Sequence, residues 1–199
     1  MAGTWKVHLS GIILIVLLFL SGINAGERQA LTYVSRFGFL SLLTILLIVA
    51  SHIMYKLKQW KFNAFVLANR QWIGIYSFVF AAMHTILAMN FFFSWDLASA
   101  MSNTYRLLGG IALLILAAMT VTSNRLSMRK LGRNWKRLHY SVYIALILIV
   151  VHSSSIGKIF MSETAIKAII IAATIILITW KLYMKKKQRP AQKNVQQGS

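Results

Sequence analysis

Acidic residues are almost missing from this sequence, which holds three Asp and Glu residues against 22 Lys and Arg residues in 199 positions. Glu27, Asp96 and Glu163 are too scattered along the chain to suggest a carboxylate pair for acid–base hydrolysis. Cysteine is absent altogether, which excludes disulfides, thiolate-ligated metals and iron–sulfur clusters. The one proline, Pro190, lies close to the C-terminus, so no proline interrupts the long apolar stretches before it.

Nucleotide-binding motifs are also missing. The sequence has no G-x-G-x-x-G and no G-x-x-x-x-G-K-[ST] pattern, and no polar stretch long enough to form a nucleotide-binding domain. Any reductant carried by NAD(P)H must therefore be handled by another protein.

What the sequence has in abundance is apolar residues, 58% of the total, which indicates an integral membrane protein. A helix needs about 20 mostly apolar residues to cross a bilayer. Six such stretches predict an all-α fold, a six-helix membrane bundle, with helices near 7–23, 36–55, 71–93, 105–122, 138–156 and 164–183. We expect residues 1–185 to form this single transmembrane domain and residues 186–199 a disordered basic cytoplasmic tail.

The basic residues are distributed unevenly between the two sides of this predicted bundle. The segment before the first stretch, the loops after the second and fourth, and the tail hold 17 of the 22, whereas the opposite loops hold the other five and all three acids. By the positive-inside rule, both termini are cytoplasmic. Such a distribution fits a membrane topology and argues against nucleic-acid binding.

The first apolar stretch has two interpretations. It is either a retained helix or a secretory signal cleaved near Ala25, because the short basic start, the apolar run and the small residues around position 25 suit both. In either case the next helix runs inward, so the orientation of the rest of the chain is the same.

Histidines are almost the only ionisable residues inside the apolar stretches, where such residues are costly and usually functional. His84 lies fourteen residues beyond Arg70, and His152 lies fifteen beyond Arg137. At 1.5 Å per residue both lie roughly 21 to 23 Å from the inner boundary. One imidazole from each of two helices at matched depth is the arrangement expected for a membrane b-type haem with two axial ligands.

A second level lies near the inner boundary. His52 precedes Lys56 by four residues and His139 follows Arg137 by two, so both lie within about 6 Å of that boundary. His139 and His152 are about 20 Å apart along one helix and cannot serve one site. The alternatives for this level are a second haem and ordinary interfacial histidines whose side chains reach water.

Other function classes remain open at this point. A histidine in a membrane helix can simply hydrogen-bond a neighbouring carbonyl or hydroxyl group, as in a structural subunit without cofactor. Histidines can also line a transport path without haem, although the sequence offers no buried carboxylate, paired broken helices or inverted repeat for a transporter.

The stretch from 129 to 152 carries a resemblance to a known family. It resembles the MsrQ (YedZ) family, within the ferric-reductase-like transmembrane superfamily, at Arg129, Lys130, Leu131, Gly132, Trp135, Leu138, His139, Val142, Tyr143 and His152. The spacing of Arg70, Gly74 and His84 agrees with it as well. The resemblance implies a haem b protein in a bacterial inner membrane, with His84, His139 and His152 associated with the haem.

By the same resemblance the chain is an electron-transfer subunit rather than a stand-alone enzyme. It would pass electrons from a quinol or a cytosolic flavin reductase to a periplasmic molybdopterin reductase, an MsrP-type methionine sulfoxide reductase. The alternative is a subunit of a transmembrane ferric or other metal reductase. FMN or quinone are further candidate cofactors, and anionic lipid is the expected partner of the basic inner face.

One departure from the larger members of the superfamily concerns the number of haems. Those members place two histidines on each of two helices, whereas Arg70 occupies the corresponding position here. A second haem at His139 would therefore need His52 as its partner. Arg70, Arg106 and Lys158 are further candidate cofactor contacts. The last two lie near the outer ends of their helices, where the alternatives are pairing with haem propionates and an ordinary interfacial role, of which the second is favoured.

Overall fold

The fold is described by a computed structural model for residues 4–23 and 28–197. These residues form ten helices, which are α1 (Thr4–Gly22), α2 (Gln29–Leu57), α3 (Lys61–Ala68), α4 (Arg70–Phe92), α5 (Leu97–Met101), α6 (Thr104–Val121), α7 (Arg125–Leu131), α8 (Arg133–Tyr140), α9 (Val142–Ile156) and α10 (Thr164–Gln197). The cleavage position considered near Ala25 lies in the gap between the described ranges.

Six helical spans are long and apolar enough to cross a membrane, which confirms the predicted all-α, six-helix membrane fold. They are α1, α2, α4, α6, the combined α8 and α9, and α10 as far as Met184. The described residues contain no strand. A backbone inside a bilayer has no water to bond, so each apolar run must form a helix that satisfies its own hydrogen bonds. This is why hydropathy alone predicted the spans.

The short helices in the connections were not predicted. Two of them begin at polar side chains that cap the first turn. Asp96 Oδ1 accepts from Ser99 N at 3.2 Å before α5, and Asn124 Oδ1 accepts from Ser127 N at 2.8 Å before α7. Gly132, with φ +50°, joins α7 to α8 in a conformation that favours glycine. The chain therefore enters the fifth span through a basic helix that begins at 133, before the expected start at 138.

The last helix also extends beyond its apolar run. α10 continues through Gln197, whereas we expected residues 186–199 to be disordered. Lys, Arg and Gln are good helix formers, so the backbone can continue as a helix after the apolar residues end. The division of the chain into a domain and a tail remains a prediction.

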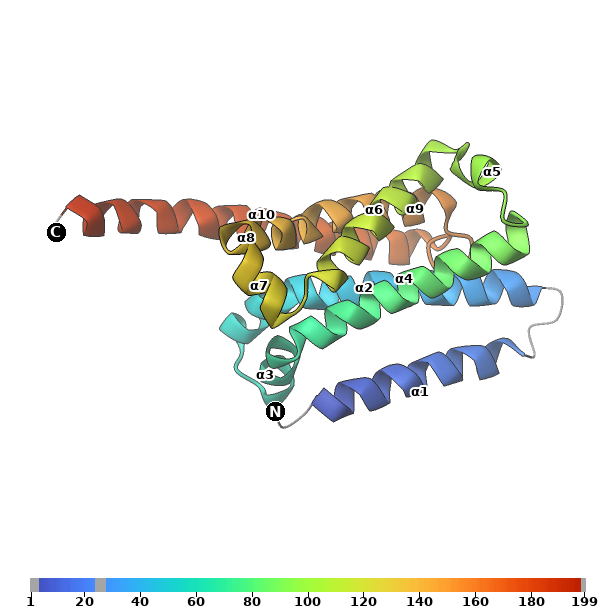
Figure 1. The fold of residues 1–199 in the computed structure, drawn as a ribbon, viewed down its shortest axis with the longest axis horizontal. Helices are drawn as coiled ribbons and strands as arrows, with labels where there is room; N and C mark the ends of the chain where they lie inside the picture. Colours follow the sequence, from blue (N-terminus) through green and yellow to red (C-terminus); the bar gives the residue numbers. More distant parts are fainter. Residues whose placement is uncertain (1–3, 24–27, 198–199) are drawn as a thin grey trace.

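The centre of the bundle consists of two helix pairs, α2 with α4 and α6 with α9. α2 also packs on α9, and α4 on α6, so the four helices enclose a common interior. The main cluster of buried apolar residues joins α2, α6, α9 and α10, with Leu42, Ile45, Leu116, Leu146 and Val150 among its members. α1 flanks α2 and α4, and α10 flanks α2 and α9 (Figure 1).

Two serines join α2 to α4 in the interior. Ser41 Oγ donates to Ser77 O at 2.9 Å, and Ser77 Oγ donates to Ser41 O at 3.1 Å. Both side chains are buried, and that of Ser77 is fully so. Small residues and interhelical hydrogen bonds hold membrane helices together, because lipid is as apolar as the side chains it would replace.

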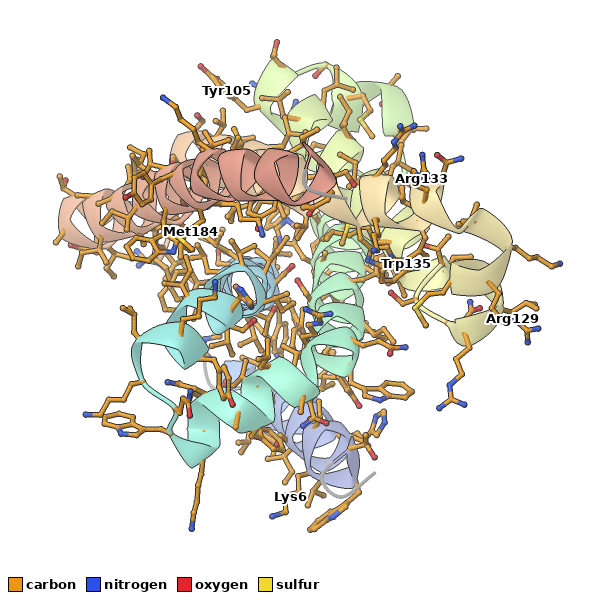
Figure 2. All side chains as sticks on the ribbon, turned by 90° about the vertical axis from the view of Figure 1, so that its left-hand side faces the viewer. Lys6, Tyr105, Arg129, Arg133, Trp135 and Met184 are labelled. Carbon is orange, nitrogen blue, oxygen red and sulfur yellow. The ribbon has the colours of Figure 1, made fainter. Side chains whose placement is uncertain are left out.

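The two ends of the bundle differ in character. The start of α1 and the end of α10 lie on the side that carries α3, α7 and α8, and the end of α1 and the start of α2 lie with α5 at the other end (Figure 1). Seen from the first end, Arg129 points away from the bundle, whereas Trp135 lies toward the other helices (Figure 2). The basic segments are thus gathered at one end, as the charge distribution predicts.

We predict that Ser77→Ala lowers the stability of the membrane-embedded fold by about 0.6 to 1.7 kcal/mol, because one interhelical hydrogen bond is lost. Ser77→Leu adds overpacking at a fully buried position, at about 1 to 3 kcal/mol. Unfolding in detergent measures both. Thr179→Ala is the control, since the Thr179 hydroxyl is exposed and bonds only within its own helix; equal effects of Ser77→Ala and Thr179→Ala would contradict the role of the serine pair.

The charge distribution also predicts the orientation of the bundle. A reporter fused after residue 199 should behave as cytoplasmic and one inserted near Ser99, in α5, as external. Alkaline phosphatase and fluorescent protein fusions measure this. The reverse pattern would overturn the assignment of an inner and an outer side.

Candidate functional site

The structure brings two histidines of different helix pairs together in the interior. His84 on α4 and His152 on α9 have ring centroids 6.1 Å apart, with ring planes 89° to each other. The two residues are 68 positions apart in sequence. Their closeness confirms the matched depth that was predicted by counting from the inner basic residues.

Both imidazoles are oriented by the same kind of hydrogen bond. His84 Nδ1 lies 2.7 Å from Val34 O on α2, and His152 Nδ1 lies 2.8 Å from Tyr105 O on α6. A carbonyl oxygen can only accept, so each Nδ1 is the donor and carries the hydrogen. When such an imidazole is neutral, its Nε2 is the unprotonated nitrogen, and the lone pair of Nε2 is available to a ligand.

A cavity of about 560 Å³ lies between the helix pairs, and both histidines line it. This volume is within the range of cofactor pockets. Most of the lining is apolar, and the polar side chains besides the histidines are Ser35, Ser41, Thr85, Arg106, Ser153 and Lys158. The cavity reaches from the level of the histidines to α5 and the segment after α9, at the outer end of the bundle.

The separation of the two imidazoles would allow both of them to hold one metal ion. With metal–nitrogen bonds of about 2 Å, the centroids of two such imidazoles are roughly 6.3 Å apart, close to the 6.1 Å between His84 and His152. Nowhere in 4–23 and 28–197 do three or more His, Cys, Asp or Glu side chains gather as metal ligands. The pair therefore suits a metal whose remaining ligands come from a macrocycle, and the apolar cavity beside it suits the macrocycle.

Arg106 lies at the outer rim of the cavity, where it holds α5 in place. Its Nε donates to Ala100 O at 2.9 Å, and its Nη2 donates to Ser99 O at 3.1 Å and to Ser102 Oγ at 2.9 Å. Its guanidinium also lies over the Phe93 ring, 5.0 Å from the centroid. Pairing of Arg106 with a propionate, which the sequence suggested, remains a prediction beside this observed role.

Lys158 lines the same cavity from the segment after α9, and its side chain is exposed. It lies at the outer end of the cavity, where a charged group of a ligand could reach both it and water. Its candidate contact with a propionate remains a prediction.

His139 occupies a separate site at the inner end. Its ring stacks on Trp135, with centroids 4.0 Å apart and an interplanar angle of 29°, and its Nε2 lies 3.5 Å from Thr122 Oγ1. Trp135 Nε1 donates to Thr122 O at 2.9 Å, which joins α8 to the end of α6. The ring of His139 is thus held between an indole and a hydroxyl group.

His52, the candidate partner of His139 in a second haem site, makes no direct contact with it among the described residues. His52 is exposed on α2, and the two imidazoles form neither a ring contact nor a hydrogen bond in the described part of the chain. Arg70, at the start of α4, lies within electrostatic range of both. The structure therefore groups these three residues at the inner end without forming a ligand pair there.

The residues that orient the two central histidines were not among the predicted site residues. The carbonyl groups of Val34 and Tyr105 could not be identified, because every residue has one and only the tertiary structure selects its partner. Gly38 and Gly109, which lie against the imidazoles, carried a weak signal. A glycine inside an apolar helix costs about 1 kcal/mol relative to alanine and usually has a packing reason.

Comparisons with known proteins agree with this architecture. The family model described as ferric reductase like transmembrane component matches residues 34–150. This range covers most of α2, all of α4 and α6, and α9 as far as Val150, two residues before His152. Curated relatives from Brucella ovis, Brucella canis and Brucella suis, each named protein-methionine-sulfoxide reductase heme-binding subunit MsrQ, are 35% identical over 121 residues.

These alignments cover 59% of this chain and 54% of each relative, so the chain spans about half the length of the curated relatives it matches. The family model matches more than half of the chain, and the six apolar spans and the paired helices agree with a multi-pass membrane protein. The chain therefore belongs to the ferric reductase like transmembrane component family.

Proposed function

We propose that this chain binds haem b between His84 and His152 and passes electrons across the bacterial inner membrane. The proposal rests on the histidine pair, whose centroid separation of 6.1 Å would allow both imidazoles to hold one haem iron. The name of the MsrQ relatives, which calls them heme-binding, supports the same cofactor.

Haem would supply a one-electron couple between the ferric and ferrous states of its iron. The residues of the chain would hold the haem, exclude water and close the outer end of the site. His84 and His152 present neutral Nε2 atoms at one level, the apolar lining of the cavity keeps water away, and Arg106 keeps α5 over the outer end. Burial and ligand type are the main means by which a protein sets the potential of such a group.

The two ends of the bundle would have different partners. A donor, either quinol or a cytosolic flavin reductase, would act at the inner end, where His139 lies about 20 Å of helical rise from the level of His152 and stacks on Trp135. The acceptor would be a periplasmic methionine sulfoxide reductase of the MsrP type. The name of the relatives, which calls them a subunit of a methionine sulfoxide reductase, supports this partner.

Two other functions are weaker candidates. A ferric or other metal reductase subunit would use the same haem site with a different acceptor, and the name of the family favours it. A histidine-lined transporter would need imidazoles free to exchange protons or ions along a path. In this chain the Nδ1 atoms of both central histidines are engaged by backbone carbonyls, which favours fixed ligands.

Loss of either central histidine tests the haem site. His84→Ala and His152→Ala should each abolish the six-coordinate low-spin haem, because no other histidine lies at their depth to replace the lost ligand. Absorption spectra of the purified variants measure this through the sharp reduced alpha and beta bands. His8→Ala is a suitable control, since His8 bonds Tyr76 on the inner side and does not line the cavity.

The proposal would be wrong if the wild-type protein showed no Soret band after expression with sufficient haem. It would also be wrong if both single variants kept their full haem content and an unchanged low-spin spectrum.

The number of haems decides the role of His139 and His52. We expect one haem per chain, with His139→Ala slowing reduction by the donor while the haem spectrum stays largely intact, because His139 is held by Trp135 and Thr122 rather than paired with His52. A pyridine haemochrome assay on wild type, His52→Ala and His139→Ala measures the ratio. A ratio near two that falls to about one in both variants would establish an inner haem instead.

A further inference from the structure

Two glycines touch the two central imidazoles. A Cβ atom added to Gly38 on α2 would lie 2.7 Å from His84 Nδ1 and 3.0 Å from its Cε1. A Cβ atom added to Gly109 on α6 would lie 2.7 Å from His152 Nδ1 and 2.8 Å from its Cε1. Real Cβ atoms are essentially never found this close to another heavy atom, so both positions require glycine while the rings stay where they are.

Each glycine lies four residues after the residue whose carbonyl group bonds the histidine. Val34 precedes Gly38 by four residues, and Tyr105 precedes Gly109 by four. In an α-helix the carbonyl of residue i points along the helix toward the N–H of residue i+4. A side chain that bonds this carbonyl from a neighbouring helix therefore lies over residue i+4, where a methyl group would occupy its place.

The same arrangement of carbonyl, glycine and histidine thus occurs twice, once in each central helix pair. In the first pair α2 supplies the carbonyl and the glycine, and α4 supplies His84. In the second pair α6 supplies the carbonyl and the glycine, and α9 supplies His152. The two halves of the site are built alike, although the residues around them in the sequence show no repeat.

We infer that Gly38 and Gly109 are positioning residues, each of which lets one imidazole donate its Nδ1–H to the carbonyl four residues earlier and so turns the unprotonated Nε2 toward the cavity. This inference deepens the haem site and rests on the proposed function for the identity of the ligand. The hydrogen-bonded arrangement itself belongs to the chain alone and can be measured without haem.

The hydrogen bond from Nδ1 matters for a ligand because it selects the tautomer, holds the ring and raises the electron density at Nε2. Loss of such an outer partner costs roughly 10- to 100-fold in metal affinity or activity. With less electron donation from the imidazole, the ferric state of a bound iron is less stabilised, so the reduction potential should shift upward.

Gly74 on α4 provides a matched control. A Cβ atom there would meet only Ile48 Cδ1, at 3.7 Å, which is an ordinary contact, and Gly74 does not line the cavity. Gly74→Ala therefore makes the same chemical change inside the same bundle without reaching an imidazole.

The first test is nitrogen-15 NMR of the full chain in lipid nanodiscs, labelled at histidine, depleted of haem and assigned with His84→Ala and His152→Ala. In the wild type and in Gly74→Ala, both central histidines should give the neutral Nδ1–H tautomer. Gly38→Ala should remove this signal from His84 alone, and Gly109→Ala from His152 alone. Unchanged tautomers in both glycine variants would overturn the inference.

With haem added, Gly38→Ala and Gly109→Ala should each lower haem affinity about 10- to 100-fold and raise the reduction potential, while Gly74→Ala should match the wild type. Unchanged affinity and potential in both glycine variants would also count against the inference. Absence of haem binding in the wild type would refute the proposed function, and the NMR result would still decide the inference.

A second pair of variants covers the case in which Gly38→Ala does not fold. If the alanine is harmful only because it meets the imidazole, then combining it with His84→Ala should restore thermal stability to that of His84→Ala alone. A combined variant as unstable as Gly38→Ala would show that the glycine serves helix packing rather than the imidazole, and would overturn the inference for this half of the site.

Discussion

The hydrogen bond between a histidine Nδ1 and a backbone carbonyl of the neighbouring helix is the interaction on which the centre of this protein depends. An imidazole in a bilayer has no water to satisfy its two ring nitrogens, and leaving them unpaired is costly. The carbonyl groups of Val34 and Tyr105 already accept within their own helices and have a second lone pair to offer. They satisfy one nitrogen of each ring, which leaves the other nitrogen for the cavity.

This requirement explains the organisation of the bundle into two pairs of closely packed helices. A side chain reaches the backbone of its neighbour only where small residues let the helices approach, and Gly38, Gly109, Ser41 and Ser77 supply such contacts. The two outer membrane-spanning helices pack less closely against this centre. α1 and α10 lie at the periphery and expose apolar side chains such as Ile12 and Ile176, as expected of surfaces that face lipid.

The two ends of the bundle differ for electrostatic reasons. The end with α7 and α8 is basic and aromatic, and there Trp135 joins α8 to α6 while the charged side chains around it remain exposed. Arg106 at the opposite end uses its guanidinium within the fold, to hold α5 over the cavity. This multi-pass protein of the ferric reductase like family thus has one basic end suited to anionic headgroups, and a short helix covers the cavity at the other end.

The membrane class, the six spans and the shared depth of His84 and His152 could be predicted from the amino-acid sequence, because hydropathy and helical rise are local properties that can be counted along the chain. Hydropathy did not show the basic helix before the fifth span or the short helices in the connections, since these are too polar to register as spans. Three features follow from the tertiary structure instead: the carbonyl that each imidazole bonds, the lack of direct contact between His52 and His139 in the described part of the chain, and the position of Gly38 against a ring. These outcomes depend on which helix faces which, and that choice is made by packing between segments far apart in the sequence rather than by any pattern within one of them.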